Sequence, residues 1–194
     1  MKKLLLSTLV IGSVAASSAF AAAPADLSGA SISATTEFAS GGTSATDGTS
    51  DTGKTSSIGL QARYDWALSP TFAIGLGGSY TSGNHQHGTY ASGNAASVNN
   101  RYSLDIIPTV ALPNDFQVYG KLSSIYGSAA SNDGVNSSNV QGVGYGVGLR
   151  KMLDKNMYLQ VGYDLNKFND VTFSNGTTSS LQENVVSFGV GYNF

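Results

Sequence analysis

Apolar and polar residues alternate with a period of two through most of the chain after its first 21 residues. In residues 58–68 every even-numbered position is apolar, while the odd-numbered positions carry Gly, Gln, Arg, Asp and Ala. A period of two places successive side chains on opposite faces of a β-strand. After residue 21, no apolar run approaches the roughly 20 residues that a membrane-spanning helix needs. The pattern therefore predicts an all-β chain.

This alternation recurs in eight segments. They cover residues 32–38, 58–68, 72–80, 102–112, 116–126, 143–149, 157–165 and 186–194. Pro108 lies inside the fourth segment, and because proline removes a ladder hydrogen bond we expect a bulge or an irregular pair there. The exact ends and register of the strands stay open at this point, above all around Pro108 and in the first, weaker segment.

The connections between the segments are of two kinds. Those after Leu68, Leu112 and Leu153 are only a few residues long. Those before Thr55 and after residues 81, 126 and 168 are long, polar and rich in Gly, Ser, Thr and Asn. Short and long connections alternate along the chain, as periplasmic turns and extracellular loops do in outer-membrane barrels, whereas a soluble sandwich has no reason to sort its loops by side.

The two faces of each segment also differ in a way that favours a membrane barrel. The polar faces are full of Gly, Ser and Ala, as a narrow, crowded interior requires. The apolar faces end in aromatic residues such as Trp66, Phe72, Phe116 and Tyr126, which suits two interfacial girdles. We therefore predict an eight-stranded antiparallel transmembrane up-and-down β-barrel, closed so that no unpaired edge meets lipid.

The N-terminus has the order of a secretory signal peptide. Lys2 and Lys3 give a positive head, residues 4–16 are apolar apart from Ser and Thr, and Ala19 and Ala21 supply the small residues before a cleavage site. We expect cleavage after Ala21. Residues 1–21 are then a signal peptide, and residues 22–194 form one exported outer-membrane β-barrel domain.

Composition narrows the class of protein further. Charged residues make up 11% of the chain, against about a quarter in typical soluble domains. The net charge of −2 becomes −4 without Lys2 and Lys3, so no basic surface for nucleic acid is expected. Because there are 0 cysteines, disulfides and thiolate metal sites are excluded. A mean hydropathy of −0.04 is compatible with a barrel, since its two faces average to neutrality.

The last eight residues carry a resemblance to a known signal. Ser187, Gly189, Tyr192 and the terminal Phe194 fill the four positions of the C-terminal targeting signal of bacterial outer-membrane proteins. The resemblance implies export past periplasmic chaperones and recognition by the barrel-assembly machinery.

The whole region 22–194 resembles the small outer-membrane β-barrel superfamily that includes the OmpA transmembrane domain, OmpX and the opacity-type adhesins. Residues 118–122, 142–149 and 158–164 are similar to the second half of such sequences. This resemblance implies insertion in the lipid of the outer membrane of a Gram-negative cell.

Eight charged residues fall on the faces assigned to the lumen. With a rise of about 3.3 Å per residue, they lie at three heights. Glu37 and Arg101 are near the loops, Asp105, Lys121 and Asp164 near the middle, and Arg63, Asp65 and Arg150 near the short turns. Asp105 and Lys121 are expected to pair across the turn at 113–115. Four acids against four bases predict a lumen plugged by paired charges, with an ion-selective pore as the alternative.

The remaining chemistry is sparse. His85 and His87 fall in the second long loop, and two imidazoles without nearby carboxylates do not predict a metal site or a cofactor. With no histidine on a predicted strand, a nucleophile–base pair is not expected, so the chain is not predicted to be an enzyme. The glycines from Gly142 to Gly148 recur with a spacing of two and precede no helix, so they are not a phosphate-binding loop.

These expectations lead to a structural, surface-display barrel with four extracellular loops, where a host or environmental ligand could bind. The alternatives are a narrow porin-like channel for small solutes and an adhesin, which the fold alone does not separate. The loops contain few aromatic residues beyond Tyr90 and Phe173, so a strongly adhesive surface is not evident. The sequence leaves the conductance of the lumen, any ligand and the oligomeric state open.

Overall fold

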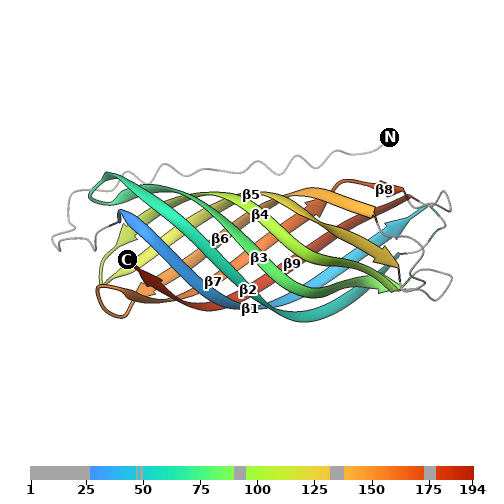
Figure 1. The fold of residues 1–194 in the computed structure, drawn as a ribbon, viewed down its shortest axis with the longest axis horizontal. Coiled ribbons are helices and arrows are strands. Elements are labelled where there is room, and N and C mark those ends of the chain that lie inside the picture. The colour runs from blue at the N-terminus through green and yellow to red at the C-terminus, as the bar shows by residue number, and fades with distance from the viewer. Residues whose placement is uncertain (1–26, 47, 49, 90–94, 132–137, 173–177) are drawn as a thin grey trace.

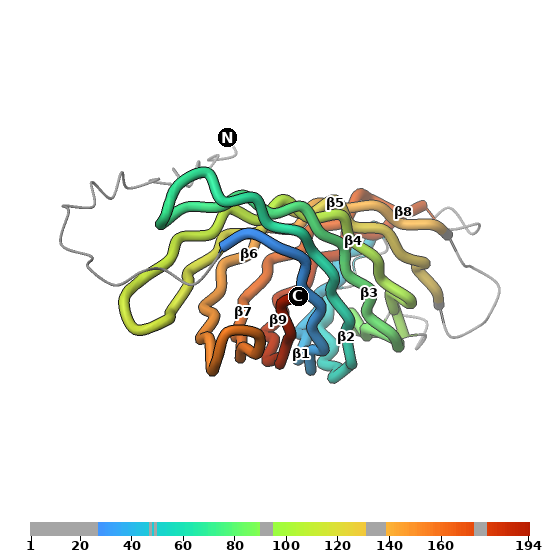
Figure 2. The backbone as a smooth tube through the Cα atoms, turned by 60° about the vertical axis from the view of Figure 1, so that its left-hand side comes forward, coloured from blue at the N-terminus to red at the C-terminus, as the bar shows by residue number. Residues whose placement is uncertain are grey.

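A computed structural model describes residues 27–46, 48, 50–89, 95–131, 138–172 and 178–194. Its strands are β1 (Gly29–Ala45), β2 (Ser50–Ser69), β3 (Phe72–Thr89), β4 (Ala95–Leu112), β5 (Phe116–Ser131), β6 (Ser138–Met152), β7 (Met157–Phe168), β8 (Val171–Thr172) and β9 (Thr178–Asn193). Each barrel strand pairs with its neighbours in antiparallel fashion, and β1 also pairs with β9, which closes the barrel (Figures 1 and 2). The two-residue β8 pairs only with β9, so eight strands form the wall and the predicted fold is confirmed.

The two ends of the barrel differ. The short turns at residues 70–71, 113–115 and 153–156 lie at one end, together with the start of β1 and the C-terminus (Figure 1). This end is called the turn end, and the opposite one the loop end. Asn114 and Asp115 both adopt left-handed φ values, near 60°, which lets the chain reverse within three residues. The predicted signal peptide, residues 1–21, lies outside the described residues, in which no helix is long and apolar enough to cross a membrane.

The predicted alternation of faces is present in every barrel strand. Outward-facing side chains from the turn end upward are large and apolar, as from Phe72 to Tyr80 on β3 and from Tyr102 to Leu112 on β4. This apolar band covers about ten residues of each strand, which matches the 9–11 residues that a tilted strand needs to span a bilayer.

The strands continue past the apolar band at the loop end. They are 12 to 20 residues long, and beyond the band their outward side chains are polar, as at Thr52, Lys54 and Ser56 on β2. The sequence interpretation assigned much of this region to loops, which is wrong. β3 runs to Thr89 and β4 begins at Ala95, so the second long connection is mostly strand. We call this extension the projecting part.

Polarity inside the barrel reverses at the same height. Within the apolar band most inward side chains are polar or small, with Ile107 and Met152 among the exceptions, whereas inside the projecting part they form a buried apolar cluster. This cluster, called the apolar cap, consists of Ala96, Val98, Ile125, Ala129, Val140, Phe168, Val171 and Leu181. The projecting part is thus built like a soluble domain, with an apolar core and a polar surface, because it needs the hydrophobic effect that water provides.

Bulges mark the junction between band and projecting part. The β3–β4 register shifts between Thr81 and Asn84, where Gly83 has a φ of 106°, and Asn100 opposite has a φ of 49°. Beyond this point the tip of β3 packs against the inner faces of β1 and β2. A Cβ atom on Gly41 of β1 would lie 2.7 Å from the ring of His87. The bulges therefore turn the β3 tip into the lumen.

Pro108 has a smaller effect than a bulge. The pairs Ile106–Leu122 and Thr109–Tyr119 keep one register on either side of it. The proline interrupts the ladder between β4 and β5 without shifting it, which is the irregular pair among the two expected alternatives.

Candidate functional site

The side chains that fill the lumen lie in three layers, and the first is at the junction below the apolar cap. Arg101 on β4 forms ion pairs with Glu37 on β1 and with Glu183 on β9. Thr81 donates a hydrogen bond to Glu37 over 3.1 Å, and Asn166 Nδ2 donates one to Glu183 Oε1 over 2.9 Å. The guanidinium group on β4 therefore joins two buried carboxylates, one on β1 and one on β9.

Sequence reasoning placed Glu37 and Arg101 at one height but missed Glu183. The alternation did contain a signal for Glu183. Like Ser187 and Gly189, it occupies an odd-numbered position, and odd-numbered positions of this strand face the lumen. The alternation continues from Val186 back toward residue 178, although its outward residues there are polar. The predicted segment began only at residue 186 because it required apolar residues at the outward positions, whereas β9 begins at Thr178.

The two histidines also belong to this layer. His85 and His87 were expected in a loop, which is wrong, because both lie on β3 with 1% and 0% of their surface exposed. The inward turn of the β3 tip explains the difference. His85 Nδ1 lies 3.2 Å from Glu183 Oε2, and His87 Nδ1 lies 2.8 Å from the carbonyl oxygen of His85. Among the described residues, no group of three His, Cys, Asp or Glu side chains could hold a metal ion.

Nδ1 of His85 faces both a donor and an acceptor. It lies 3.2 Å from Glu183 Oε2, which only accepts hydrogen bonds, and 3.4 Å from Arg101 Nη1, which only donates them. Nε2 lies 3.1 Å from Ser57 Oγ. Ser57, His85 and Glu183 thus stand in the order nucleophile, base and carboxylate that hydrolases use. Glu183 also pairs with Arg101, however, and His85 is enclosed beneath the apolar cap.

The middle layer lies within the apolar band. Lys121 Nζ is 2.9 Å from Asp164 Oδ1, and this pair joins β5 to β7 across β6. Asp105 lies opposite Ser123, whose hydroxyl donates to Asp105 Oδ1 over 2.6 Å. The expected pair between Asp105 and Lys121 is therefore wrong, because the β4–β5 register places Lys121 two residues from the partner of Asp105.

The third layer lies at the turn end. Arg63 Nε is 2.7 Å from Asp65 Oδ2 on the same strand. Arg150 on β6 lies over the ring of Tyr158, with its guanidinium carbon 3.8 Å from the ring centroid. The guanidinium carbons of Arg63 and Arg150 are each 6.0 Å from the ring centroid of Tyr119, so both cations contact the same ring.

Glycines in the wall make room for these side chains. A Cβ atom on Gly148 would lie 2.2 Å from the ring of Tyr119, and one on Gly191 would lie 2.2 Å from the ring of Tyr158. Distances this short exclude any larger residue unless the ring moves. The Gly-rich faces therefore act as the wall against which the long lumen side chains pack.

The C-terminal residues of the predicted assembly signal are split between the two faces. Tyr192 and Phe194 point outward, with their ring centroids 5.2 Å apart. Ser187 and Gly189 face the lumen, and a Cβ atom on Gly189 would lie 2.8 Å from the carbonyl oxygen of Ala34. The terminal strand thus presents an aromatic edge to the outside at the turn end.

Comparison with known proteins agrees with this architecture. The family model described as outer membrane protein beta-barrel domain matches residues 6–194. No curated protein matches the chain.

Several solved outer-membrane proteins share the fold. Ail, the attachment invasion locus protein of Yersinia pestis, solved with the heparin analogue sucrose octasulfate, is 16% identical with a TM-score of 0.53, over 86% of this chain and 99% of Ail. Neisserial surface protein A is 14% identical with a TM-score of 0.54, over 86% and 98% of the two chains. OprG from Pseudomonas aeruginosa is 15% identical with a TM-score of 0.50, over 87% and 97%.

Proposed function

The chain belongs to the outer membrane protein beta-barrel domain family, and from that premise we propose that it is a sealed barrel with a structural and surface-display role. It is an integral β-barrel of the Gram-negative outer membrane. In the proposed orientation, the short turns face the periplasm and the projecting part extends from the cell surface. Its polar outer wall then meets water, and its connections are available to a host or environmental ligand.

The observation that carries the proposal is the double closure of the lumen. The apolar cap fills the interior of the projecting part, and three layers of charged side chains fill the interior of the band. An eight-stranded barrel is only wide enough for side chains to fill it. An ion on its way through would have to displace an apolar core and then break buried ion pairs, which favours a sealed barrel over a porin-like channel.

The proposal is tested by recording single-channel currents from the refolded protein in planar bilayers. We expect no steady conductance from the natural sequence. A variant in which Phe168 and Leu181 of the apolar cap and Arg101, Lys121 and Arg150 of the three layers are all replaced by glycine should conduct, because it opens both closures of the lumen. A large steady conductance of the natural sequence would overturn the proposal in favour of a porin.

A matched control keeps this comparison interpretable. Replacing five outward-facing residues by glycine also removes five large side chains, but from the lipid face: Leu104, Ile106, Leu122, Leu159 and Leu165. This control should stay silent. Both variants are first checked for folding by the difference in gel mobility between heated and unheated samples, so that an open defect in a misfolded barrel is not counted as a channel.

We propose that the chain is not an enzyme, although Ser57 and His85 are in hydrogen-bond contact. A nucleophilic serine needs space for a substrate at its oxygen and donors for the developing oxyanion. His85 instead lies in the enclosed layer beneath the apolar cap, where it orders side chains. A fluorophosphonate probe should therefore leave Ser57 unlabelled in the folded protein. Labelling that disappears in His85→Gln would show that the chain is a hydrolase.

The connections at the loop end do not suit a polyanionic ligand. Residues 46–49, 90–94, 132–137 and 169–177 contain Asp47, Asp133 and Asp170 but neither lysine nor arginine. Ail was solved with a sulfated sugar, and such a ligand needs basic side chains at the binding surface. We therefore propose an uncharged or cationic ligand for any contact made by these connections, and weak binding to heparin-coated surfaces checks this.

A further inference from the structure

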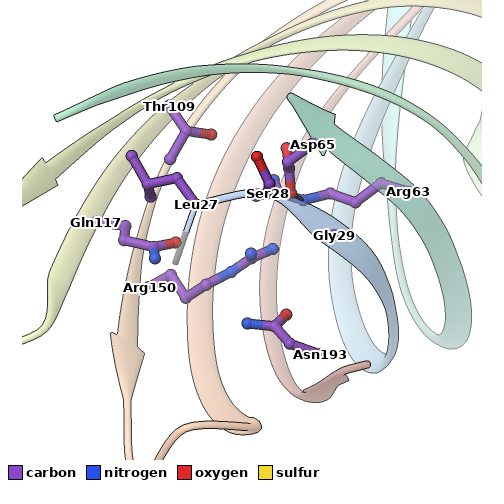
Figure 3. A pocket seen from close by; sticks show the side chains of 9 residues that line it. All are labelled: Leu27, Ser28, Gly29, Arg63, Asp65, Thr109, Gln117, Arg150 and Asn193. Carbon is purple, nitrogen blue, oxygen red and sulfur yellow. Dashed lines mark ion pairs between the residues drawn. The ribbon is translucent and has the colours of Figure 1, made fainter. Parts of the chain in front are cut away.

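A small cavity lies inside the turn end of the barrel (Figure 3). It provides about 10 Å³ for the centre of a water-sized particle, which is room for a single water-sized occupant. Its lining combines backbone and side chains of Leu27, Ser28, Gly29, Arg63, Asp65, Thr109, Gln117, Arg150 and Asn193. Nearly all of its polar groups can donate hydrogen bonds.

The charges of this lining do not balance. Arg63 and Arg150 contribute two guanidinium groups, and Asp65 contributes the one carboxylate of the lining. Asp65 is bound to Arg63 at 2.7 Å. Figure 3 shows Arg150 extending across the cavity toward these two residues from the opposite wall. All three side chains are buried, so the site holds one positive charge in excess in a place where charges are normally paired.

Arg150 and Thr109 have donors without acceptors, and Asp65 Oδ1 is an acceptor without a donor among the described residues. Arg150 is 2% exposed, and its Nε has no hydrogen-bond partner among the described residues. Its Nη2 reaches only Gln160 Oε1, over 3.4 Å. Thr109 is 1% exposed, and its hydroxyl oxygen is unpartnered within the same described set. Buried donors without acceptors are costly, and a single acceptor in the cavity would satisfy several of them.

From the excess charge, the free donors and the size of the cavity, we propose that the turn end binds one monatomic anion, with chloride as the physiological ligand. The anion lies between Arg150 and Thr109, and the Arg63–Asp65 pair forms its other wall. The pocket is partly open to solvent, but its interior of about 10 Å³ has no room for a whole phosphate, sulfate or carboxylate group. The site is separate from the proposed sealing function, because the two layers above it close the lumen whether or not an anion is bound.

Binding to the folded barrel alone shifts the unfolding equilibrium by the factor 1 + [Cl⁻]/Kd. Raising chloride from its Kd to ten times that value therefore lowers the unfolding constant about fivefold. The experiment follows urea unfolding of the refolded protein in lipid vesicles, in mixtures of potassium chloride and potassium gluconate at constant ionic strength. Gluconate is too large for the cavity, so the mixtures vary only the concentration of a ligand that fits.

Two variants and one control locate the effect. Arg150→Met keeps the long side chain but removes the excess charge, and should abolish the chloride dependence. Thr109→Val conserves volume and removes the hydroxyl, so the dependence should persist but shift to higher chloride. Lys151→Met removes the next cation along the chain, which does not line the cavity. Lys151 Nζ lies 3.6 Å from Asp115 Oδ2, and this variant should respond to chloride as the natural sequence does.

A crystal grown in bromide provides a readout that does not depend on stability. Anomalous scattering should show one bromide ion within hydrogen-bonding distance of the Arg150 guanidinium group. Unfolding that is the same in chloride and gluconate, or a chloride effect that survives in Arg150→Met, would overturn the proposal and leave water as the occupant. The absence of a bromide peak in the cavity would overturn it as well.

Discussion

The strongest energetic consequence of the structure concerns Arg101. Its guanidinium group is paired with both Glu37 and Glu183, and all three side chains are buried. Replacement by methionine keeps an unbranched side chain of similar reach but leaves two carboxylates in the layer without that cation. Losing one partner of a buried ion pair costs about 3–5 kcal/mol, so we expect Arg101→Met to destabilise the barrel by roughly that amount.

The same substitution at two other cations gives a graded series. Lys121 pairs with the one carboxylate of Asp164, and the two side chains keep 18% and 13% exposure, so Lys121→Met should cost about 1.5–3 kcal/mol, as for one charge-assisted hydrogen bond. Lys151 and Asp115 are 3.6 Å apart, with 36% and 64% exposure, and Lys151→Met should cost about 0–1 kcal/mol. The expected order of destabilisation is therefore Arg101, Lys121, Lys151.

Urea unfolding in lipid vesicles measures this order. Trp66 is the only tryptophan of the chain and faces outward in the apolar band, so its fluorescence reports the transfer of the wall from lipid to water. Adding Glu183→Gln to Arg101→Met should recover part of the loss, because it removes one unpaired charge. If Arg101→Met falls within about 1 kcal/mol of Lys151→Met, the buried-pair argument does not hold for this lumen.

Four further outcomes are expected. Mass spectrometry of outer-membrane fractions should find Ala22 as the first residue, and chains that retain residues 1–21 would contradict the predicted cleavage. Deleting Phe194 should reduce the heat-modifiable folded species without blocking export, and unchanged assembly would count against the C-terminal signal. Gly148→Ala should lower stability by about 1–3 kcal/mol through the Tyr119 ring, unlike Gly120→Ala, whose Cβ meets no atom closer than 3.4 Å. Backbone N–H groups of Met157 and Asn156 hold the pKa of Asp154 below its usual 3.8. These hydrogen bonds should therefore stabilise the turn fully above pH 3.8, and the stabilisation should be lost as the pH falls through the lower pKa of the folded protein. NMR titration of Asp154 in micelles measures that pKa.

The faces of the strands followed from the sequence because an extended backbone alternates its side chains whatever its partners are. Residues 58–68 therefore identified both the outward apolar row and the inward position of Arg63 and Asp65 before any strand was paired. The same logic predicted the number of strands and the turn at residues 113–115. It also grouped the lumen charges by height, since the rise per residue is nearly constant.

Which charges meet was decided only by the tertiary structure. Pairing depends on the register of each strand pair. Register shifts at bulges add up from strand to strand around the barrel, and bulges leave little trace in the sequence. The β4–β5 register places Asp105 beside Ser123, and the β3 bulge near Gly83 turns His85 toward Glu183. Closure of β1 on β9 brings Glu37 and Glu183 to the same guanidinium group, although they are 146 positions apart in the chain.

The projecting part shows the same division. Its alternation is visible in the sequence, but the sense of the alternation reverses, with polar side chains outside and the apolar cap inside. A period of two states only that the two faces differ. Which face is buried depends on whether lipid or water lies outside, and each strand passes from one solvent to the other at a height that the assembled barrel sets.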